Sequence, residues 1–410
     1  MSDALVPLDL DSIRAHFPAL TRTSGGREVA YLDGPGGTQV PRGVIEAMGD
    51  VLRLGVSNLG GHFDSSRLAE MVTAGGREAM AEFFNSDPEE ISFAQNMTSV
   101  TFAVSRALSR QWRPGDAIVV TSLDHDANFT PWVRAAEDNG VEVRIAHFDP
   151  VTGVLDPAAI ADLLDDRVRL VATCVASNAI GTVVDVAAIT TAAHEAGALV
   201  YLDAVHAGPH HLLDVRAIDC DFLVASAYKF FGPHTGIFYG RFDLLGELDF
   251  YKVRPAPSDP PGKLETGTQS FESIAGVIAT IDYLAGLGSG VDRRSRLESG
   301  YARIHRHERA LAERFLSGVA GLAKVTIHGV PDADDRRVAT FALSVAGMTA
   351  DEVAGVLAGR GIYVWAGHYY AINAIERLGF LDKGGLVRIG FVHYNTAAEV
   401  DRALDALASL

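Results

Sequence analysis

The sequence predicts an α/β protein with a large domain built on a mainly parallel seven-stranded sheet and a smaller α+β domain. Two observations support this prediction. Between about residues 90 and 240, helical stretches alternate with seven short, mostly β-branched runs: ISFA, AIVVT, EVRIA, LVATCV, LVYLD, FLVAS and GIFY. Such alternation is typical of βαβ units, whose parallel sheets are covered by helices on both faces. After this region the pattern changes to a long helical stretch followed by more widely spaced strands.

The second half of the chain predicts the smaller domain. Residues 254–268, RPAPSDPPGKLETGT, are rich in proline and predict a loop that ends the sheet region. A helical region of roughly 270–318 follows. The strand candidates KVTIHGV, VATFALSV, IYVW and VRIGF come next, with helices at about 350–359 and 396–408. The predicted domains are a large one, residues 26–284, and a small one, residues 1–25 with 285–410.

Composition narrows the class of function. The 410 residues are 48% apolar, which is enough to bury two sizeable cores. A formal net charge of −17 gives a surface that repels nucleic acid and anionic membranes. The N-terminal residues lack a basic region followed by an apolar stretch, and nowhere do eighteen apolar residues run together. We therefore expect a cytoplasmic protein whose ligand is a small molecule.

Lysine is scarce, and one lysine stands in an informative place. Of the five lysines, only Lys229 directly follows a predicted buried strand, in FLVASAYKFFGP. The carboxyl end of a parallel strand lies at the sheet edge where α/β folds bind ligands. A lysine there can form an imine with an aldehyde cofactor. The alternative is a solvated loop lysine.

Asp203 strengthens the cofactor interpretation. It ends the preceding strand, LVYLD, and so lies at the same sheet edge as Lys229. Pyridoxal 5'-phosphate (PLP) needs a carboxylate against its pyridine nitrogen, because the protonated ring accepts the electrons of a carbanion. Alone, Asp203 could cap a helix or bind a metal ion. Together with a lysine 26 residues later, it favours PLP.

Other strand ends and one helix start carry further polar residues. His125 follows the strand AIVVT and can stack on a cofactor ring and relay protons, or it is an ordinary loop residue. Asn178 follows LVATCV and can hydrogen-bond a ring hydroxyl. Met97, Thr98 and Ser99 begin a helix, where backbone NH groups and hydroxyls bind phosphate. For Thr98 a plain N-cap is the alternative.

Four segments, YLDAVHAGPH, SAYKFFGP, ETGTQ and VRIGFVHYNT, together resemble the class V aminotransferase superfamily, and most closely its cysteine desulfurase-like proteins. The opening FPALTRTSGGREVAYLDGPGGTQVP is similar to their N-terminal segment, so the resemblance covers nearly the whole chain. It implies the PLP-dependent transferase fold type I, PLP as the cofactor and a small amino acid as the substrate. It also implies a homodimer with active sites at the subunit interface.

The resemblance implies a role for each residue that contacts the cofactor ring. Lys229 is the Schiff-base lysine, Asp203 pairs with the pyridine nitrogen, and His125 stacks over the ring. These three are the predicted catalytic residues. His206, in the stretch DAVH, lies near the cofactor hydroxyl beside Asn178.

Phosphate and substrate contacts are implied in the same way. Thr98 and Ser226 bind the phosphate, and Thr268 reaches the phosphate of the neighbouring subunit. Tyr228 replaces the histidine that usually precedes the lysine in desulfurases, so one phosphate contact is expected to differ. Arg388, in VRIGF, holds the substrate carboxylate; a solvated strand arginine is the alternative.

The chain departs from true cysteine desulfurases in one loop. Those enzymes carry a cysteine in the pattern Arg-x-Gly-x-x-Cys, whereas this chain has WAGHYYAIN. Tyr370 takes the position of the sulfur acceptor, and Trp365 takes that of an arginine. With Tyr369 they suggest an aromatic wall of the substrate pocket, or ordinary core packing. A phenol cannot carry a persulfide, and Cys174 and Cys220, in or beside apolar strands, are expected to be buried.

Two weaker patterns predict no further site. His206, His210 and His211 do not favour a metal centre, because Gly208 and Pro209 prevent a regular helix with paired ligands. The stretch GPGGTQ lacks the spacing of a dinucleotide fingerprint or a P-loop, so a substrate-side loop is expected.

The favoured hypothesis for function is cleavage of a carbon–sulfur bond in a small amino acid by α,β-elimination. Lys229 would remove the α-proton and a β-leaving group would depart, so no acceptor cysteine is required. Transamination or epimerisation is the alternative, because the same carbanion supports both. A catalytically silent binding protein with this fold is a third hypothesis, disfavoured because the predicted catalytic residues are all intact.

Overall fold

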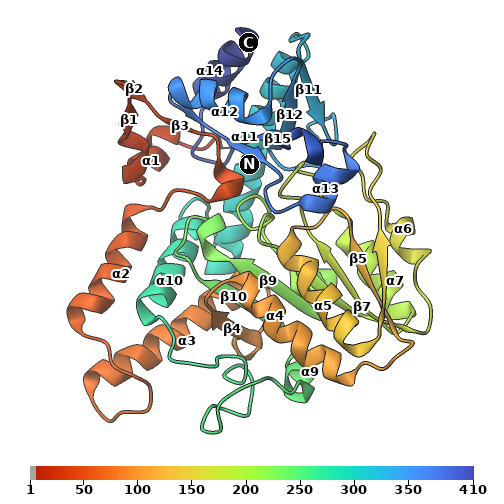
Figure 1. Ribbon diagram of the computed structural model, residues 1–410. Coiled ribbons are helices and arrows are strands. Elements are labelled where there is room, and N and C mark those ends of the chain that lie inside the picture. The colour runs from red at the N-terminus through yellow and green to blue at the C-terminus, as the bar shows by residue number, and fades with distance from the viewer. Residues whose placement is uncertain (1–5) are drawn as a thin grey trace.

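A seven-stranded sheet forms the centre of the larger part of the computed structural model, which describes residues 6–410 (Figure 1). The strand order is β4-β10-β9-β8-β7-β5-β6. The strands from β9 to β6 run parallel, whereas β10 is antiparallel to both neighbours. The predicted mainly parallel sheet is confirmed. Its strands are β4 (Ile91–Ala94), β5 (Ala117–Thr121), β6 (Glu142–Ala146), β7 (Val168–Cys174), β8 (Leu199–Asp203), β9 (Phe222–Ser226) and β10 (Gly236–Gly240).

Helices cover both faces of this sheet because successive side chains of each strand point to opposite faces. Ile118 and Val120 of β5 belong to a buried cluster with residues of α4 and α5. Val119 between them belongs to the cluster that contains residues of α3, α7 and α10. The helices of this part are α2 (Arg42–Leu54), α3 (Asp64–Phe84), α4 (Met97–Leu108), α5 (Thr130–Asn139), α6 (Pro157–Ala161), α7 (Val186–Glu195), α8 (Val215–Ile218), α9 (Phe242–Glu247) and α10 (Phe271–Ala285).

The smaller part, at the top of Figure 1, contains a four-stranded sheet in the order β11-β12-β15-β14. Its buried cluster joins residues of these strands to residues of the surrounding helices. No helix among residues 6–410 is long and apolar enough to cross a membrane, and the cytoplasmic location stays a prediction. The elements are α11 (Arg293–Val319), β11 (Val325–His328), β12 (Thr340–Val345), α12 (Ala350–Gly359), β14 (Trp365–Gly367), α13 (Ile372–Arg377), β15 (Leu386–Gly390) and α14 (Ala397–Ala408).

The predicted strand IYVW is two strands in two different sheets. β13 (Ile362–Tyr363) pairs in parallel with β3 (Ala30–Tyr31), near the N-terminus. After Val364, β14 pairs with β15 instead. Alternation of apolar residues cannot show such a change of partner, because both halves keep the same period. The switch brings the segment after Trp365 to the edge of the larger part.

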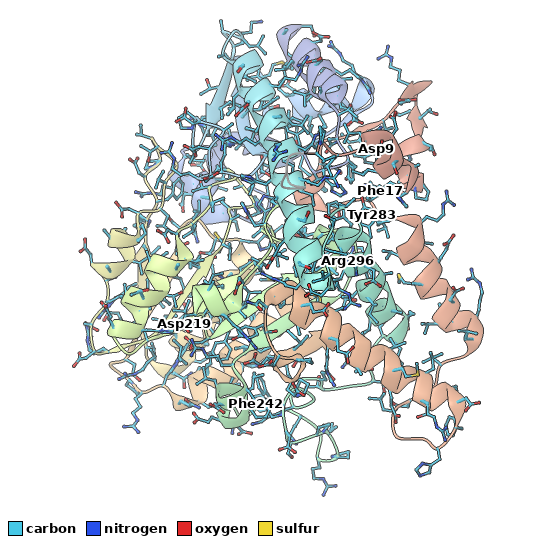
Figure 2. All side chains as sticks on the ribbon, turned by 180° about the vertical axis from the view of Figure 1, so that it is seen from behind. Asp9, Phe17, Asp219, Phe242, Tyr283 and Arg296 are labelled. Atoms are coloured by element: carbon cyan, nitrogen blue, oxygen red, sulfur yellow. The ribbon has the colours of Figure 1, made fainter. Side chains whose placement is uncertain are left out.

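The N-terminal segment also joins the two parts. α1 (Leu10–Ala15) is capped by Asp9, whose side chain accepts a hydrogen bond from the backbone of Ser12. Phe17 follows and is fully buried, with its ring 5.4 Å from that of Tyr283 in α10 and 5.0 Å from that of Tyr394 (Figure 2). Two short strands, β1 (Thr23–Ser24) and β2 (Arg27–Glu28), form a separate hairpin.

The predicted helical region 270–318 breaks into α10 and α11. A Cβ at Gly288 would lie 2.2 Å from the carbonyl oxygen of Arg296, so the close approach of the linker to α11 requires glycine there. α11 begins after Asp292, which forms a capping box with Ser295. The predicted loop 254–268 contains no helix or strand. The domain boundaries at 26–284 and 285–410 stay a prediction.

Candidate active site

A cavity of about 640 Å³ opens at the carboxyl ends of β5, β7, β8 and β9. The smaller part closes one side of it with β15 and the segment 365–370, and Pro35 and Gly36 of the GPGGTQ loop line it too. Of the predicted site residues, Ser99 and Thr268 do not line the cavity. Those that line the cavity are Met97, Thr98, His125, Asn178, Asp203, His206, Ser226, Lys229, Trp365, Tyr370 and Arg388.

Lys229 ends a short 3-10 turn that directly follows β9. Its Nζ donates a hydrogen bond to the carbonyl oxygen of Pro35 at 2.5 Å and lies 4.8 Å from the ring centre of Tyr228. Burial, helped by the nearby Arg388 cation, lowers the pKa of Lys229 to about 7. Near neutral pH a large share of this amine is therefore uncharged, which is the form that attacks an aldehyde.

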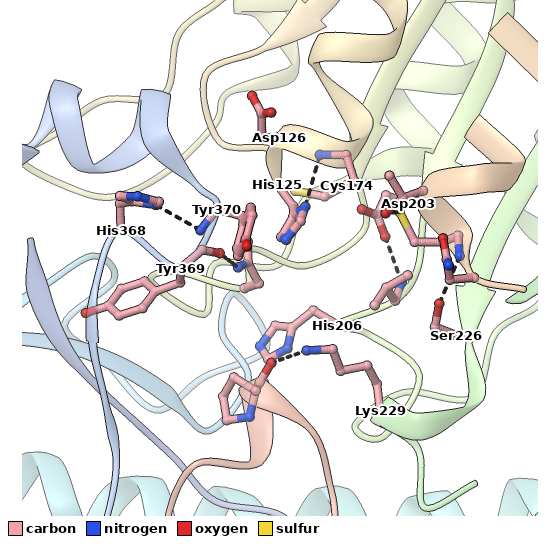
Figure 3. A pocket seen from close by; sticks show the side chains of 18 of the residues that line it. His125, Asp126, Cys174, Asp203, His206, Ser226, Lys229, His368, Tyr369 and Tyr370 are labelled. Atoms are coloured by element: carbon pink, nitrogen blue, oxygen red, sulfur yellow. Dashed lines mark hydrogen bonds between the residues drawn. The ribbon is translucent and has the colours of Figure 1, made fainter. Parts of the chain in front are cut away.

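Asp203, the last residue of β8, is buried across the cavity from Lys229 (Figure 3). Its Oδ1 accepts a hydrogen bond from the backbone NH of Val205 at 2.9 Å. Burial raises the pKa of Asp203 to about 6, and Lys229 opposes the rise. A protonated pyridine nitrogen at this carboxyl would favour the charged carboxylate further, because opposite charges stabilise each other in a buried site.

His125 follows β5 and caps the short turn Asp126–Asn128. Its Nδ1 accepts a hydrogen bond from the backbone NH of Ala127 at 3.0 Å, so the proton of the neutral ring is on Nε2. Burial, together with the Lys229 and Arg388 cations, lowers the pKa of His125 to about 4. The imidazole is therefore neutral at pH 7 and can donate a hydrogen bond only from Nε2.

The start of α4 offers a site for a phosphate. The backbone NH of Met97 donates a hydrogen bond to Ser226 Oγ at 3.1 Å, which brings both predicted phosphate ligands together. Thr98 is exposed beside them. The N-cap is Asn96, whose side chain accepts from the backbone of Ser99 at 2.9 Å. The alternative that Thr98 is the N-cap is therefore wrong. The backbone NH of Ser99 already donates to Asn96 and is not free to bind a phosphate.

Arg388 is buried on β15, and within residues 6–410 it has no hydrogen bond to a carboxylate. Its Nη1 donates to the carbonyl oxygen of Asn178 at 2.9 Å, and its guanidinium lies 4.5 Å from the ring centre of Tyr369. Its Nε has no hydrogen-bond partner within residues 6–410. Burial lowers the pKa of Arg388 to about 10, so the group stays cationic at pH 7. A buried cation of this kind favours a bound anion.

Asn178 and His206 flank the same part of the cavity. Asn178 Nδ2 donates to the carbonyl oxygen of Tyr369 at 2.9 Å, which ties the larger part to the segment 365–370. His206 Nε2 shares a hydrogen bond with Thr340 Oγ1 at 3.1 Å. Burial keeps the pKa of His206 well below its usual value, so the ring is neutral. Their contacts with a cofactor hydroxyl stay predictions.

Asp33 is a candidate that sequence reasoning missed. Its buried Oδ1 has no hydrogen-bond partner within residues 6–410. Burial raises the pKa of Asp33 to about 6, although the Arg388 and Lys229 cations oppose the rise. The run VAYLD does end at this carboxylate, but its approach to Arg388 depends on the bridge between Asp33 and Gly390.

The two cysteines are buried, as expected. Cys220 has no exposed surface and Cys174 is 4% exposed. Cys174 lies opposite Asp203 in the β7–β8 register, and burial raises the pKa of its thiol well above the usual value. The pKa of the Cys220 thiol is raised by burial as well. Neither thiol has the exposure or the lowered pKa that a reactive nucleophile needs.

The residues of this cavity fit PLP on their own chemistry. An amine with a lowered pKa, a buried carboxyl group opposite it and a helix N-terminus surround one space. Its volume lies within the range of ordinary cofactor pockets. Thr268 stands apart: its Oγ1 accepts a hydrogen bond from Asn58 Nδ2 at 3.5 Å, and its contact with a second subunit stays a prediction. No group of side chains able to hold a metal ion is found in residues 6–410.

Fold and cavity together define a PLP-dependent enzyme of fold type I. The family model of class V aminotransferases matches residues 30–403, and the chain therefore belongs to the class V aminotransferase family. The resemblance described above is confirmed, and with it PLP as the cofactor.

Relatives and solved structures agree with this assignment. An uncharacterised protein of Mycobacterium tuberculosis is 32% identical, covering 98% of this chain and 99% of the relative. A cysteine desulfurase of Serratia proteamaculans is 31% identical, covering 97% of each chain. The apo structure of a cysteine desulfurase from Thermococcus onnurineus superposes with a TM-score of 0.88 at 25% identity, covering 100% of this chain and 99% of that one. The chain is thus an enzyme similar to cysteine desulfurases.

Proposed function

We propose that this enzyme cleaves a carbon–sulfur bond in a small amino acid by α,β-elimination, without a persulfide on the protein. The observation that carries the proposal is that no exposed thiol lines the cavity. Tyr370 is 67% exposed at the mouth, while both cysteines are buried. The names of the relatives support a sulfur-containing amino acid as the substrate.

When bound, PLP supplies an electron sink that stabilises negative charge at the substrate Cα. Lys229 would hold this group by a covalent link, Asp203 by its carboxylate on the opposite side, and His125 by stacking of its imidazole. Asn178 and His206 would contact it near the ring hydroxyl. Met97, Thr98 and Ser226 would hold it with donors at and beside the start of α4.

The chain's own side chains would then orient the substrate and move its protons. Arg388 binds the α-carboxylate, because it is a buried cation without a carboxylate hydrogen bond. Lys229 Nζ takes the α-proton, and a pKa of about 7 suits a general base at neutral pH. His125 Nε2 is the protonated ring nitrogen and can donate a hydrogen bond to the departing sulfur.

The test is to identify the products formed from L-cysteine, cystine and cysteine conjugates by the PLP-loaded enzyme. We expect pyruvate and ammonia, with the sulfur released as a free thiol or sulfide. Alanine, with sulfur retained on the protein, would instead indicate a persulfide-forming desulfurase. A requirement for a 2-oxo acid would indicate transamination. Solvent deuterium at Cα without pyruvate would indicate epimerisation.

We also propose a homodimer, as the resemblance implies. Large apolar side chains of α2, α3 and the loop between them are exposed, and such a surface is typical of an interface. Asn58, in the same loop, holds the hydroxyl of Thr268, so the residue expected to reach the neighbouring subunit lies beside this surface. The exposed side chains are Ile45, Leu52, Leu54, Leu59, Phe63 and Met71.

A further inference from the structure

The segment 365–370 crosses the mouth of the cavity in a strained conformation. Tyr369 and Tyr370 have φ angles of +53° and +60°, a left-handed backbone that is uncommon for bulky residues. Both of their carbonyl groups are held by the larger part. The backbone NH of Asp126 donates to Tyr370 at 2.6 Å, and Asn178 Nδ2 donates to Tyr369 at 2.9 Å. Strain of this kind gathers at ligand clamps, where it fixes the direction of side chains.

The strained segment presents aromatic surface that is largely exposed. The Tyr370 ring lies nearly parallel to the imidazole of His125, with centres 5.5 Å apart, yet 67% of the residue stays exposed (Figure 3). Trp365 is 52% exposed. Its indole packs on Gly36, where a Cβ would lie 2.3 Å from the indole nitrogen, so only bare backbone fits beneath it. Large aromatic faces that line a cavity and remain open favour an apolar or aromatic ligand.

The charged groups that line the cavity also favour an apolar ligand at its mouth. Lys229 and Arg388 are the only lysine and arginine that line the cavity within residues 6–410, and both have roles with the cofactor and the α-carboxylate. The carboxylate of Asp126 already accepts hydrogen bonds from the Thr130 hydroxyl at 2.9 and 3.0 Å. Within residues 6–410, a substrate side chain that extends to the mouth therefore meets aromatic rings and no further lysine or arginine.

We propose that the sulfur of the substrate carries an aromatic or bulky apolar group, so that S-aryl and S-aralkyl cysteine conjugates are preferred over free cysteine. This inference rests on the proposed elimination. The α-proton goes to Lys229 Nζ, and the Cβ–S bond breaks with its electron pair on sulfur, which takes a proton from the Lys229 ammonium to leave as a thiol. With one water molecule the balance is conjugate to pyruvate, ammonium and thiol. The aryl group stacks against Tyr370 and Trp365.

The first test compares S-phenyl-L-cysteine with L-cysteine as substrates of the PLP-loaded enzyme, with pyruvate as the readout. We expect kcat/KM to be at least about 10-fold higher for the phenyl conjugate, because burial of an aromatic ring has that order of effect. An equal or higher kcat/KM for cysteine would overturn this inference and leave the elimination standing. Pyruvate from neither substrate would overturn the elimination itself, and the inference with it.

The second test asks whether Tyr370 supplies the preference. Tyr370→Ala should lower the ratio of kcat/KM for the phenyl conjugate to kcat/KM for cysteine by about 10-fold or more, mostly through KM for the conjugate. Tyr370→Phe should keep the wild-type ratio, because it keeps the ring. The matched control is Tyr251→Ala, since Tyr251 is 68% exposed and outside the cavity. A ratio unchanged in both Tyr370→Ala and Trp365→Ala would overturn the assignment.

Discussion

At the scale of single residues, burial shifts the pKa values of the titratable groups that line the cavity. Lys229, Asp203 and His125 each have a pKa shifted toward the neutral form, and burial is the largest cause in every case. At pH 7 the cavity therefore contains an uncharged imidazole and an amine of which a large share is uncharged. Arg388 keeps its charge in the same surroundings because its ordinary pKa is so much higher.

The shifted pKa of Lys229 predicts how fast the cofactor-free protein binds PLP covalently. Only the neutral amine reacts, so the rate should rise with pH to a midpoint near 7 and then level off, whereas an ordinary lysine would give a midpoint near 10.5. Reductive trapping at fixed times measures the rate. Arg388→Gln removes a cation that lowers this pKa, so its midpoint should move to higher pH. A midpoint near pH 10 in the wild-type protein would contradict a Lys229 pKa that is lowered by burial.

The strand-end residues could be found from the sequence because topology brings them together. Lys229, Asp203, His125 and Asn178 follow different strands, yet parallel strands all end at one edge. Asp33 could not be found in this way, because its position depends on pairings between distant segments near both ends of the chain.

At the scale of elements, the strands were predictable and the contacts between elements were not. Each of the seven runs forms a strand of the large sheet. The inner parallel strands, such as β5 and β9, are apolar runs because both of their faces are buried. The switch of partner at Val364 and the break between α10 and α11 follow from packing against other segments. A local pattern contains no information on the first, whereas the glycine-rich stretch GLGSG before the N-cap Asp292 marks the second.

Packing between α3 and α10 gives a prediction for Gly76. A Cβ there would lie 2.3 Å from Cγ2 of Ile274 in α10, so Gly76→Ala should destabilise the protein by about 1–3 kcal/mol. Urea unfolding measures the change. The matched control is Gly355→Ala in α12, where a Cβ meets nothing within 4 Å; it should stabilise by up to about 1 kcal/mol. Equal changes in the free energy of unfolding for the two variants would contradict this prediction and show that α3 and α10 move apart at little cost.

At the scale of the whole molecule, the exposed apolar surface of α2, α3 and their loop predicts the oligomeric state. Wild-type protein should sediment as a dimer. Leu52→Lys with Leu54→Lys should shift it toward monomer, because two charges would have to be buried in the interface. Val291→Lys is the control, since Val291 is 99% exposed on the linker between α10 and α11. A monomeric wild type would remove the basis for a role of Thr268 in a neighbouring site.

Because segment 365–370 and β15 close one side of the cavity, the cavity is completed late in the synthesis of the chain. A ribosome has released Lys229 and Asp203 well before residues 365–388 emerge. Until then the nascent sheet edge lacks one wall, and also the Arg388 cation that helps to keep the lysine uncharged. The cavity is therefore completed only when residues 365–388 pack against the sheet edge, late in the synthesis of the chain.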